Sequence, residues 1–288
     1  MYMIKHLILS GGSWKGFYML GVIQELIKKK YIEIDKIQSV WGTSVGSLIG
    51  VFLCLKLDWE CIVEFCINKP FIINEIESSF DNIIKIYNNC GIFDIDLFYN
   101  ITNLFNAQKL DLKNITLKEF YDFSKKDLHI FAVNYDTLET VDFNHETHPD
   151  IKLIEAIYCS CSIPLIFKPL KINNVIYLDG GINEHFPTEK CCKKKNKKEI
   201  LGIYIKTIGE EKKDSDINII NYSIDLLYKI VFEKQKKHLN KLKNQLIITT
   251  PFFNFEKVKN ILLNKEKRRE IVEGGKNYAY IFLNTKKN

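Results

Sequence analysis

The chain has almost no arginine. Among its 288 residues only Arg268 and Arg269 carry a guanidinium group. Arginine supplies the bidentate contacts to phosphate and guanine on which specific nucleic-acid recognition depends. The net charge of +6, from 41 basic and 35 acidic residues, is modest. It fits a protein that binds an anionic surface about as well as one that does not. The sequence therefore argues against nucleic acid as a partner.

The chain also lacks a long apolar segment. Its longest apolar run, Val45 to Leu55, is much shorter than the ~20 residues that cross a bilayer. The apolar stretch Met1 to Ser10 leads into a glycine loop rather than a cleavage site, so we expect neither a signal peptide nor a transmembrane helix. The expected location is the cytoplasm, with peripheral association with membranes left open.

The eight cysteines follow no recognisable pattern. Zinc sites and small disulfide frameworks both need regular spacing, and here no C-x-x-C pairs with histidine. The phosphate-binding motif G-x-x-x-x-G-K-[ST] is missing, and G-x-G-x-x-G is broken at Ser13. We therefore expect reduced thiols, no metal and no cofactor.

What the chain does contain is a serine between two glycines at the end of a predicted strand. The stretch Val40 to Ser47 (VWGTSVGS) holds G-x-S-x-G, with Gly42, Ser44 and Gly46, and continues into an apolar helix. In a nucleophile elbow, a sharp turn from strand to helix exposes the serine hydroxyl, and small neighbours allow the backbone to turn. Ser44 is therefore the candidate nucleophile, although G-x-S-x-G alone also arises by chance.

A glycine-rich loop follows the first predicted strand, His6 to Ser10, and precedes a predicted helix that ends near Lys30. Free backbone N–H groups in such a loop can stabilise an oxyanion beside a serine nucleophile. The candidate residues for this oxyanion hole are Gly11, Gly12, Ser13 and Gly16.

An aspartate ends another predicted strand far along the chain. Val175 to Leu178 is followed by Asp179, Gly180 and Gly181, which puts a carboxylate at the sheet edge where active sites of α/β proteins lie. Asp-Gly is also a common turn pair, so a plain Asx turn stays open at this point. His185, six residues later, is a further candidate base.

Strands and helices alternate along most of the chain. This alternation predicts an α/β fold, a single three-layer domain with a mainly parallel sheet and helices on both faces. Residues 70–126 mix aromatic and polar residues with few clean periods. They form either a helical cap over the site or, as such stripes favour, ordinary surface helices with aromatic core faces. Lys190 to Lys198, with six lysines, is predicted to be a solvated loop.

Four motifs in this order resemble the patatin-like phospholipase family, and the likeness covers about residues 5–285. Leu9 to Gly16 (LSGGSWKG) is similar to the oxyanion loop of that family, and Gly42 to Gly46 (GTSVG) to its nucleophile elbow. Ser160 to Phe167 (SCSIPLIF) resembles the serine-to-proline stretch before the catalytic aspartate. Asp179 to Pro187, which begins with DGG, resembles the end of the site.

The resemblance implies a lipid acyl hydrolase with a Ser-Asp dyad instead of a triad. Ser44 would attack the acyl ester carbonyl, and Asp179 would take its proton. N–H groups near Gly11, Gly12 and Ser13 would hold the oxyanion. The implied substrate is a phospholipid or another acyl-ester lipid at a membrane surface, and no metal or cofactor is implied.

One position departs from the family pattern, because Ser13 stands where the third glycine of the loop is expected. If this residue needs a positive φ, serine costs on the order of 1 kcal/mol there. Two alternatives follow from the sequence. One is a catalytically weakened family member that acts as a membrane-surface or partner-binding module, and the other is a triad esterase that uses His185.

Overall fold

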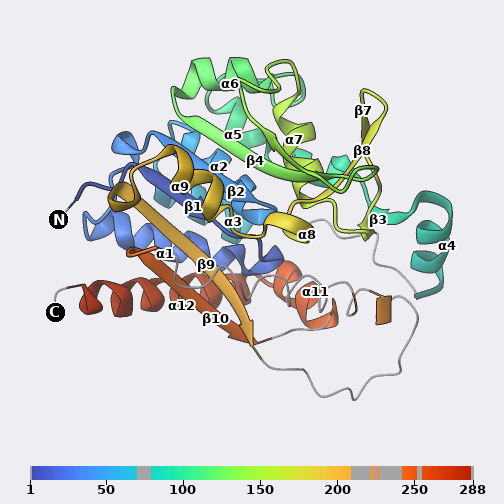
Figure 1. Cartoon of the computed structure of the whole chain (residues 1–288). Coiled ribbons are helices and arrows are strands. Elements are labelled where there is room, and N and C mark those ends of the chain that lie inside the picture. The colour runs from blue at the N-terminus through green and yellow to red at the C-terminus, as the bar shows by residue number, and fades with distance from the viewer. Residues whose placement is uncertain are drawn as a thin grey trace.

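One large sheet runs through the molecule (Figure 1). The fold is that of a computed structural model, which describes residues 2–69, 79–208, 222–223, 226, 242–251 and 255–286. Within these residues the sheet has eight strands in the order β10-β9-β1-β2-β4-β8-β7, with β5 beside β4. The strands are β1 (His6–Leu9), β2 (Ser39–Thr43), β4 (Asp127–Asn134), β5 (Thr140–Phe143), β7 (Lys171–Ile172), β8 (Val175–Asp179), β9 (Ile200–Ile208) and β10 (Gln245–Pro251).

The sheet is parallel through its centre and antiparallel at one edge. β10, β9, β1, β2 and β4 pair in parallel, whereas β5 and β8 pair antiparallel with β4, and β7 with β8. Because β1, β2 and β4 run in one direction, the glycine loop after β1 and the serine turn after β2 meet at the same sheet edge. The candidate base, Asp179, lies at the same edge because β8 ends there, paired with the C-terminal end of β4.

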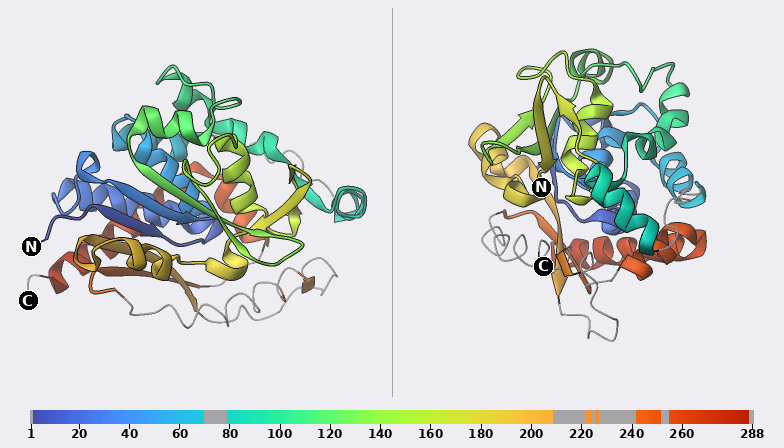
Figure 2. Two further views of the ribbon diagram at one scale, coloured as in Figure 1. Left: turned by 45° about the horizontal axis from the view of Figure 1, so that its top comes forward. Right: turned by 90° about the vertical axis from the view of Figure 1, so that its right-hand side faces the viewer.

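Helices lie on both faces of the sheet (Figure 2). Side chains that alternate along each strand point to opposite faces, so Leu7 and Leu9 join the larger buried cluster while Ile8 joins the smaller one. The larger cluster packs against most of the helices, and the smaller one against the segment around α9. Outside residues 70–126, the described helices are α1 (Gly16–Lys28), α2 (Val45–Cys54), α3 (Trp59–Asn68), α7 (Leu153–Cys161), α8 (Gly181–Glu184), α9 (Thr188–Lys194), α11 (Phe255–Leu263) and α12 (Lys265–Thr285).

The predicted α/β fold with a mainly parallel sheet and helices on both faces is confirmed. The sequence also predicts a strand at Asp127 to Asn134, which has those bounds as β4, and a closing helix from Lys265 to about Leu283, which is α12. Among the described helices, none has the length and hydropathy that a membrane crossing requires. Two further predictions from the sequence are a linker at Gly209 to Asp214 and a long amphipathic segment at Asp214 to Lys243. The linker lies outside the described residues, as does nearly all of the amphipathic segment.

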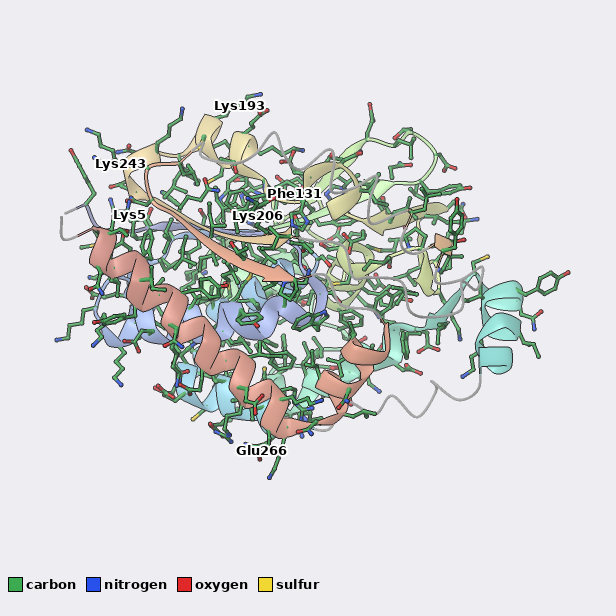
Figure 3. All side chains as sticks on the ribbon, turned by 90° about the horizontal axis from the view of Figure 1, so that it is seen from below. Lys5, Phe131, Lys193, Lys206, Lys243 and Glu266 are labelled. Carbon is green, nitrogen blue, oxygen red and sulfur yellow. The ribbon has the colours of Figure 1, made fainter. Side chains whose placement is uncertain are left out.

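The prediction of a solvated loop over Lys190 to Lys198 is wrong. Residues Thr188–Lys194 form α9, and a 3₁₀ turn follows at Lys197–Glu199. The helix has one buried side and one exposed side, which its many lysines made hard to recognise in the sequence. The Cys191 side chain is fully buried in the smaller cluster, while Lys193 extends away from the ribbon (Figure 3).

The segment predicted as a cap or as surface helices is mainly helical where it is described. Residues 70–78 lie outside the described part; the rest forms α4 (Ser79–Asn89), α5 (Thr102–Asn106) and α6 (Leu117–Ser124), with a 3₁₀ helix at Ile95–Ile101. Phe105 and Phe120 are buried in the larger cluster, which matches surface helices with aromatic core faces. α4 lies apart from the body (Figure 1). A small parallel sheet of β3 (Gly91–Phe93) and β6 (Leu165–Phe167) was not foreseen from the sequence.

Candidate active site

Ser44 stands on the turn between β2 and α2. Its φ of 54° and ψ of −127° fall in a region that residues with a side chain rarely occupy, and such strained residues gather at functional sites. The neighbours must be glycine: a Cβ on Gly42 would lie 2.5 Å from the Gly46 carbonyl oxygen, and one on Gly46 would lie 2.4 Å from the Leu9 carbonyl oxygen. The predicted strand, tight turn and helix are therefore all present around Ser44.

Two buried hydroxyls outside the G-x-S-x-G pattern hold this turn. The Ser44 N–H donates to Ser160 Oγ at 2.9 Å, and Ser47 Oγ donates to the Ser44 carbonyl oxygen at 2.6 Å. Ser44 itself is 6% exposed. The peptide groups on both sides of the Ser44 side chain are thus fixed by hydrogen bonds from within the fold.

Asp179 lies at the end of β8, beside Ser44, and is almost fully buried. Its Oδ1 accepts the Gly181 N–H at 2.6 Å, while its buried Oδ2 has no well-formed hydrogen bond within the described part of the chain. Burial raises the pKa of Asp179 to about 6, and the nearby Ser44 hydroxyl and the Gly181 N–H offset part of this rise. The structure therefore brings the candidate nucleophile and the candidate base together.

The two glycines after Asp179 are set by close approaches. A Cβ on Gly180 would lie 2.1 Å from the Phe131 carbonyl oxygen, and one on Gly181 would lie 2.8 Å from Asp179 Oδ1. The Gly180 contact packs the strand end against β4, and the Gly181 contact lets its N–H reach the carboxylate. The bond from the Gly181 N–H to Asp179 Oδ1 is the Asx turn that an Asp-Gly pair predicts, and the close approach of Gly180 to β4 is additional to it.

The glycine loop lies against the elbow, but two of its predicted donors already have acceptors. The Gly11 N–H donates to the His185 carbonyl oxygen at 3.0 Å, and the Gly16 N–H donates to the Ser13 carbonyl oxygen at the start of α1. Across the described residues, the N–H groups of Gly12 and Ser13 have no hydrogen-bond acceptor. The free donors of the loop are thus Gly12 and Ser13.

Ser13 has a φ of 53°, so the conformational cost expected for a serine in place of glycine applies. This cost is on the order of 1 kcal/mol. The loop still presents the Ser13 N–H, because the conformation is a property of the backbone and the side chain only makes it less favourable. Gly12 also cannot be replaced freely, since a Cβ there would lie 2.5 Å from Ile205 Cδ1.

His185 packs across the glycine loop. A Cβ on Gly11 would lie 2.9 Å from His185 Nδ1 and 3.5 Å from Ser44 Cβ, so the imidazole and the elbow flank Gly11. The His185 ring meets Tyr204 edge to face, with 5.9 Å between the ring centroids. The histidine is therefore part of the wall beside the site, and its carbonyl oxygen fixes the loop.

Sequence reasoning missed the side chains that Ser160 to Phe167 sends to the site. The Cys161 thiol lies against the hydroxyls of Ser44 and Ser47. Burial, assisted by the negative charge of Asp179, raises the pKa of this thiol well above its usual range. Since the thiolate is the nucleophilic form, Cys161 is a neutral packing residue. The motif resemblance was the signal that could have pointed to these residues.

No group of three or more His, Cys, Asp or Glu side chains in the described ranges is arranged to hold a metal ion. The chemistry that the arrangement offers comes from its own residues: a hydroxyl on a strained turn, a buried carboxyl with a raised pKa, and two free N–H groups beside them.

Comparison with known sequences agrees with these motifs. Residues 7–191 match the family model of the patatin-like phospholipases, a range that includes the glycine loop, the elbow and Asp179. Probable lipid hydrolase 463L of Invertebrate iridescent virus 6 is 30% identical over 239 residues, which are 75% of this chain and 77% of the viral protein. Triacylglycerol lipase 5 of Saccharomyces cerevisiae is 24% identical over 226 residues, 69% of this chain but only 29% of the yeast protein.

Solved structures with the same fold include two bacterial proteins. VipD from Legionella pneumophila superposes with a TM-score of 0.62 at 16% identity and covers 99% of this chain and 67% of its own. The type III effector ExoU gives a TM-score of 0.50 at 12% identity, over 98% of this chain and 53% of its own. At these identities the likeness shows the fold alone.

Proposed function

The chain belongs to the patatin-like phospholipase family, and we propose that it hydrolyses lipid acyl esters with a dyad of Ser44 and Asp179. The observation that supports this proposal most is the position of Ser44, on a strained turn beside a buried carboxyl whose Oδ2 is left without a hydrogen bond by the described residues. That oxygen is the one able to receive the proton of a serine.

The reaction proceeds in two halves. Ser44 Oγ attacks the acyl carbonyl carbon while Asp179 takes the hydroxyl proton, and the oxyanion is stabilised by the free N–H groups of Gly12 and Ser13. The intermediate collapses, the alcohol leaves with the proton from Asp179, and an acyl-serine remains. A water molecule, deprotonated by Asp179, then releases the fatty acid and restores Ser44.

The raised pKa of Asp179 suits this role. An ordinary aspartate, with a pKa near ~3.9, is a weak base at neutral pH, and a catalytic base works best when its pKa approaches the working pH. With a pKa of about 6, the carboxyl is still ionised at pH 7 but binds the serine proton more readily. Gly181 keeps Oδ1 engaged and so orients Oδ2.

The pH dependence of the reaction should report this carboxyl. We expect kcat/KM on a neutral ester to have an acidic limb with an apparent pKa of about 6 and to fall roughly tenfold for each pH unit below it, because the protonated acid cannot act as base. Initial rates between pH 4.5 and 8 on an uncharged ester measure it. A limb with its midpoint near pH 4 would mean that the base is not this buried carboxyl.

The proposed substrates are phospholipids or neutral acyl esters at a membrane surface. Purified wild-type protein is assayed on a short-chain nitrophenyl ester, phosphatidylcholine vesicles and a triacylglycerol emulsion, and its reactive serine is labelled with a fluorophosphonate and located by mass spectrometry. We expect turnover of at least one substrate and labelling of Ser44. Absence of both favours the alternative of a catalytically weakened, surface-binding family member.

His185 provides the arm of this experiment that separates a dyad from a triad. His185→Gln keeps a side chain of similar size beside Gly11 but removes the imidazole base. We expect activity within about tenfold of wild type, because proton transfer uses Asp179 and the His185 carbonyl oxygen that holds the loop is unchanged. If a normally folded variant loses activity as completely as a Ser44 variant, the triad is the better description.

A further inference from the structure

Ser160 is hydrogen-bonded to the segments that carry the candidate nucleophile and the candidate base, but it is neither of these residues. It lies in the last turn of α7 and is fully buried. Its Oγ donates to the Phe131 carbonyl oxygen at 2.6 Å and accepts the Ser44 N–H at 2.9 Å. A single hydroxyl thus joins α7, β4 and the elbow.

The bond to Ser44 answers a need created by the elbow. Ser44 follows the last residue of β2, Thr43, and its buried N–H therefore needs an acceptor outside the strand ladder. Ser160 Oγ is that acceptor. The hydrogen bond favours the strained conformation that presents the Ser44 hydroxyl.

The same turn of α7 also holds the base. The last carbonyl groups of a helix have no partner within the helix, and here the Ser160 carbonyl oxygen accepts the Gly180 N–H at 3.2 Å while that of Ser162 accepts the Asp179 N–H at 2.9 Å. The Phe131 carbonyl oxygen that receives the Ser160 hydroxyl is the atom closest to a Cβ built on Gly180. The backbones of the candidate nucleophile and the candidate base are therefore both hydrogen-bonded to one short segment, the end of α7.

We propose that Ser160 is a positioning residue, which fixes the Ser44 backbone relative to Asp179 through its side chain and its carbonyl oxygen. This inference rests on the proposed function of the dyad. A displacement of even about 1 Å in such a pair can cost roughly 100-fold in rate, so the role is measurable apart from stability.

The test compares three variants in the full-length chain. Ser160→Ala removes the hydroxyl, and Ser160→Cys fills the space with a weaker donor and acceptor. Ser124→Ala is the matched control, because Ser124 is also a buried serine in the last turn of a helix, α6, but its hydroxyl accepts the Lys126 N–H at 3.2 Å, near the start of β4 and away from the elbow. Each variant is measured for melting temperature, for kcat and KM, and for the exchange rate of the Ser44 amide hydrogen.

We expect Ser160→Ala to lower kcat about 10- to 100-fold with KM nearly unchanged, and to speed exchange of the Ser44 amide by roughly tenfold or more. Ser160→Cys should fall between Ser160→Ala and wild type. Ser124→Ala should keep both kcat and Ser44 exchange near wild type even where it lowers the melting temperature.

Equal effects of Ser160→Ala and Ser124→Ala on kcat and on exchange would overturn the positioning role and leave a purely structural one. The exchange measurement needs no turnover. If the wild type hydrolyses no ester, the proposed function fails, while unchanged Ser44 exchange in Ser160→Ala is the separate result that rejects the positioning role. Should Ser160→Ala not fold, Ser160→Cys carries the same comparison.

Discussion

Ser44→Ala should lower ester hydrolysis by roughly four to six orders of magnitude, the range seen when a nucleophilic serine is removed. The loss follows because the acyl-serine cannot form, so only binding and oxyanion stabilisation remain. The fold should be kept, since alanine at this φ meets about the same steric cost as serine and the N–H of residue 44 still donates to Ser160 Oγ. Turnover of the best wild-type substrate and loss of fluorophosphonate labelling measure the effect.

Ser39→Ala is the matched control for this variant. Ser39 is another buried serine, but it lies at the start of β2, the end of the strand opposite Ser44, where its Oγ accepts the Trp41 indole N–H. We expect reduced stability and nearly wild-type kcat. If Ser44→Ala kept more than about 1% of wild-type activity, the covalent route through Ser44 would be wrong.

Asp179→Asn should lower kcat by about a thousandfold or more, near the upper end of what a positioned general base contributes. Asparagine keeps the shape of the side chain, and its Oδ1 can still accept the Gly181 N–H that now meets Asp179 Oδ1 at 2.6 Å. What is lost is the oxygen that receives the Ser44 proton. The measurement is single-turnover and steady-state hydrolysis, with kcat and KM resolved.

The same substitution should stabilise the fold at neutral pH. Burial raises the folded-state pKa of Asp179 from 3.8 to about 6, so the stability that this group contributes is fully present below pH 3.8 and is lost as the pH rises through 6. At pH 7 the buried charge costs on the order of 3 kcal/mol, at about 1.4 kcal/mol per pKa unit. A neutral asparagine avoids that cost.

We therefore expect Asp179→Asn to melt at a higher temperature than wild type at pH 7, with the difference disappearing toward pH 4. Thermal melts across this range test it. An active variant that melts at a lower temperature at pH 7 would mean that the carboxyl stabilises the fold as a hydrogen-bond acceptor and is not the catalytic base. A dead variant with increased stability is the result that the dyad predicts.

The sequence was sufficient to predict those features that depend on backbone conformation at neighbouring residues. Gly42 and Gly46 predict the turn at Ser44 because no other residue leaves room for the carbonyl oxygens of Gly46 and Leu9. Asp179 could be placed at a strand end from the apolar run before it. The mostly apolar run Asp127 to Asn134 (DLHIFAVN) predicted β4 with its bounds. The prediction for Lys190 to Lys198 was wrong because one buried cysteine was enough to dock a helix.

Which backbone N–H groups of the glycine loop already have an acceptor could not be predicted from the residues of the loop. Gly11 and Gly12 are neighbours of the same type, yet the Gly11 N–H is taken by the carbonyl oxygen of His185, which is remote in sequence. Ser13, which the sequence marked as a departure, remains a free donor at a positive φ. Which N–H groups face a substrate depends on the neighbours that the fold supplies.

The candidate reacting groups can be named from the sequence, because a strained serine turn and a carboxylate at a strand end are specified by the residues next to them. How these groups behave depends on the tertiary structure. The raised pKa of Asp179 comes from burial by distant segments, and the clamp on Ser44 comes from Ser160, 116 residues away. Desolvation and hydrogen bonding act through space, so a local pattern can name the nucleophile and the base but cannot set their energies.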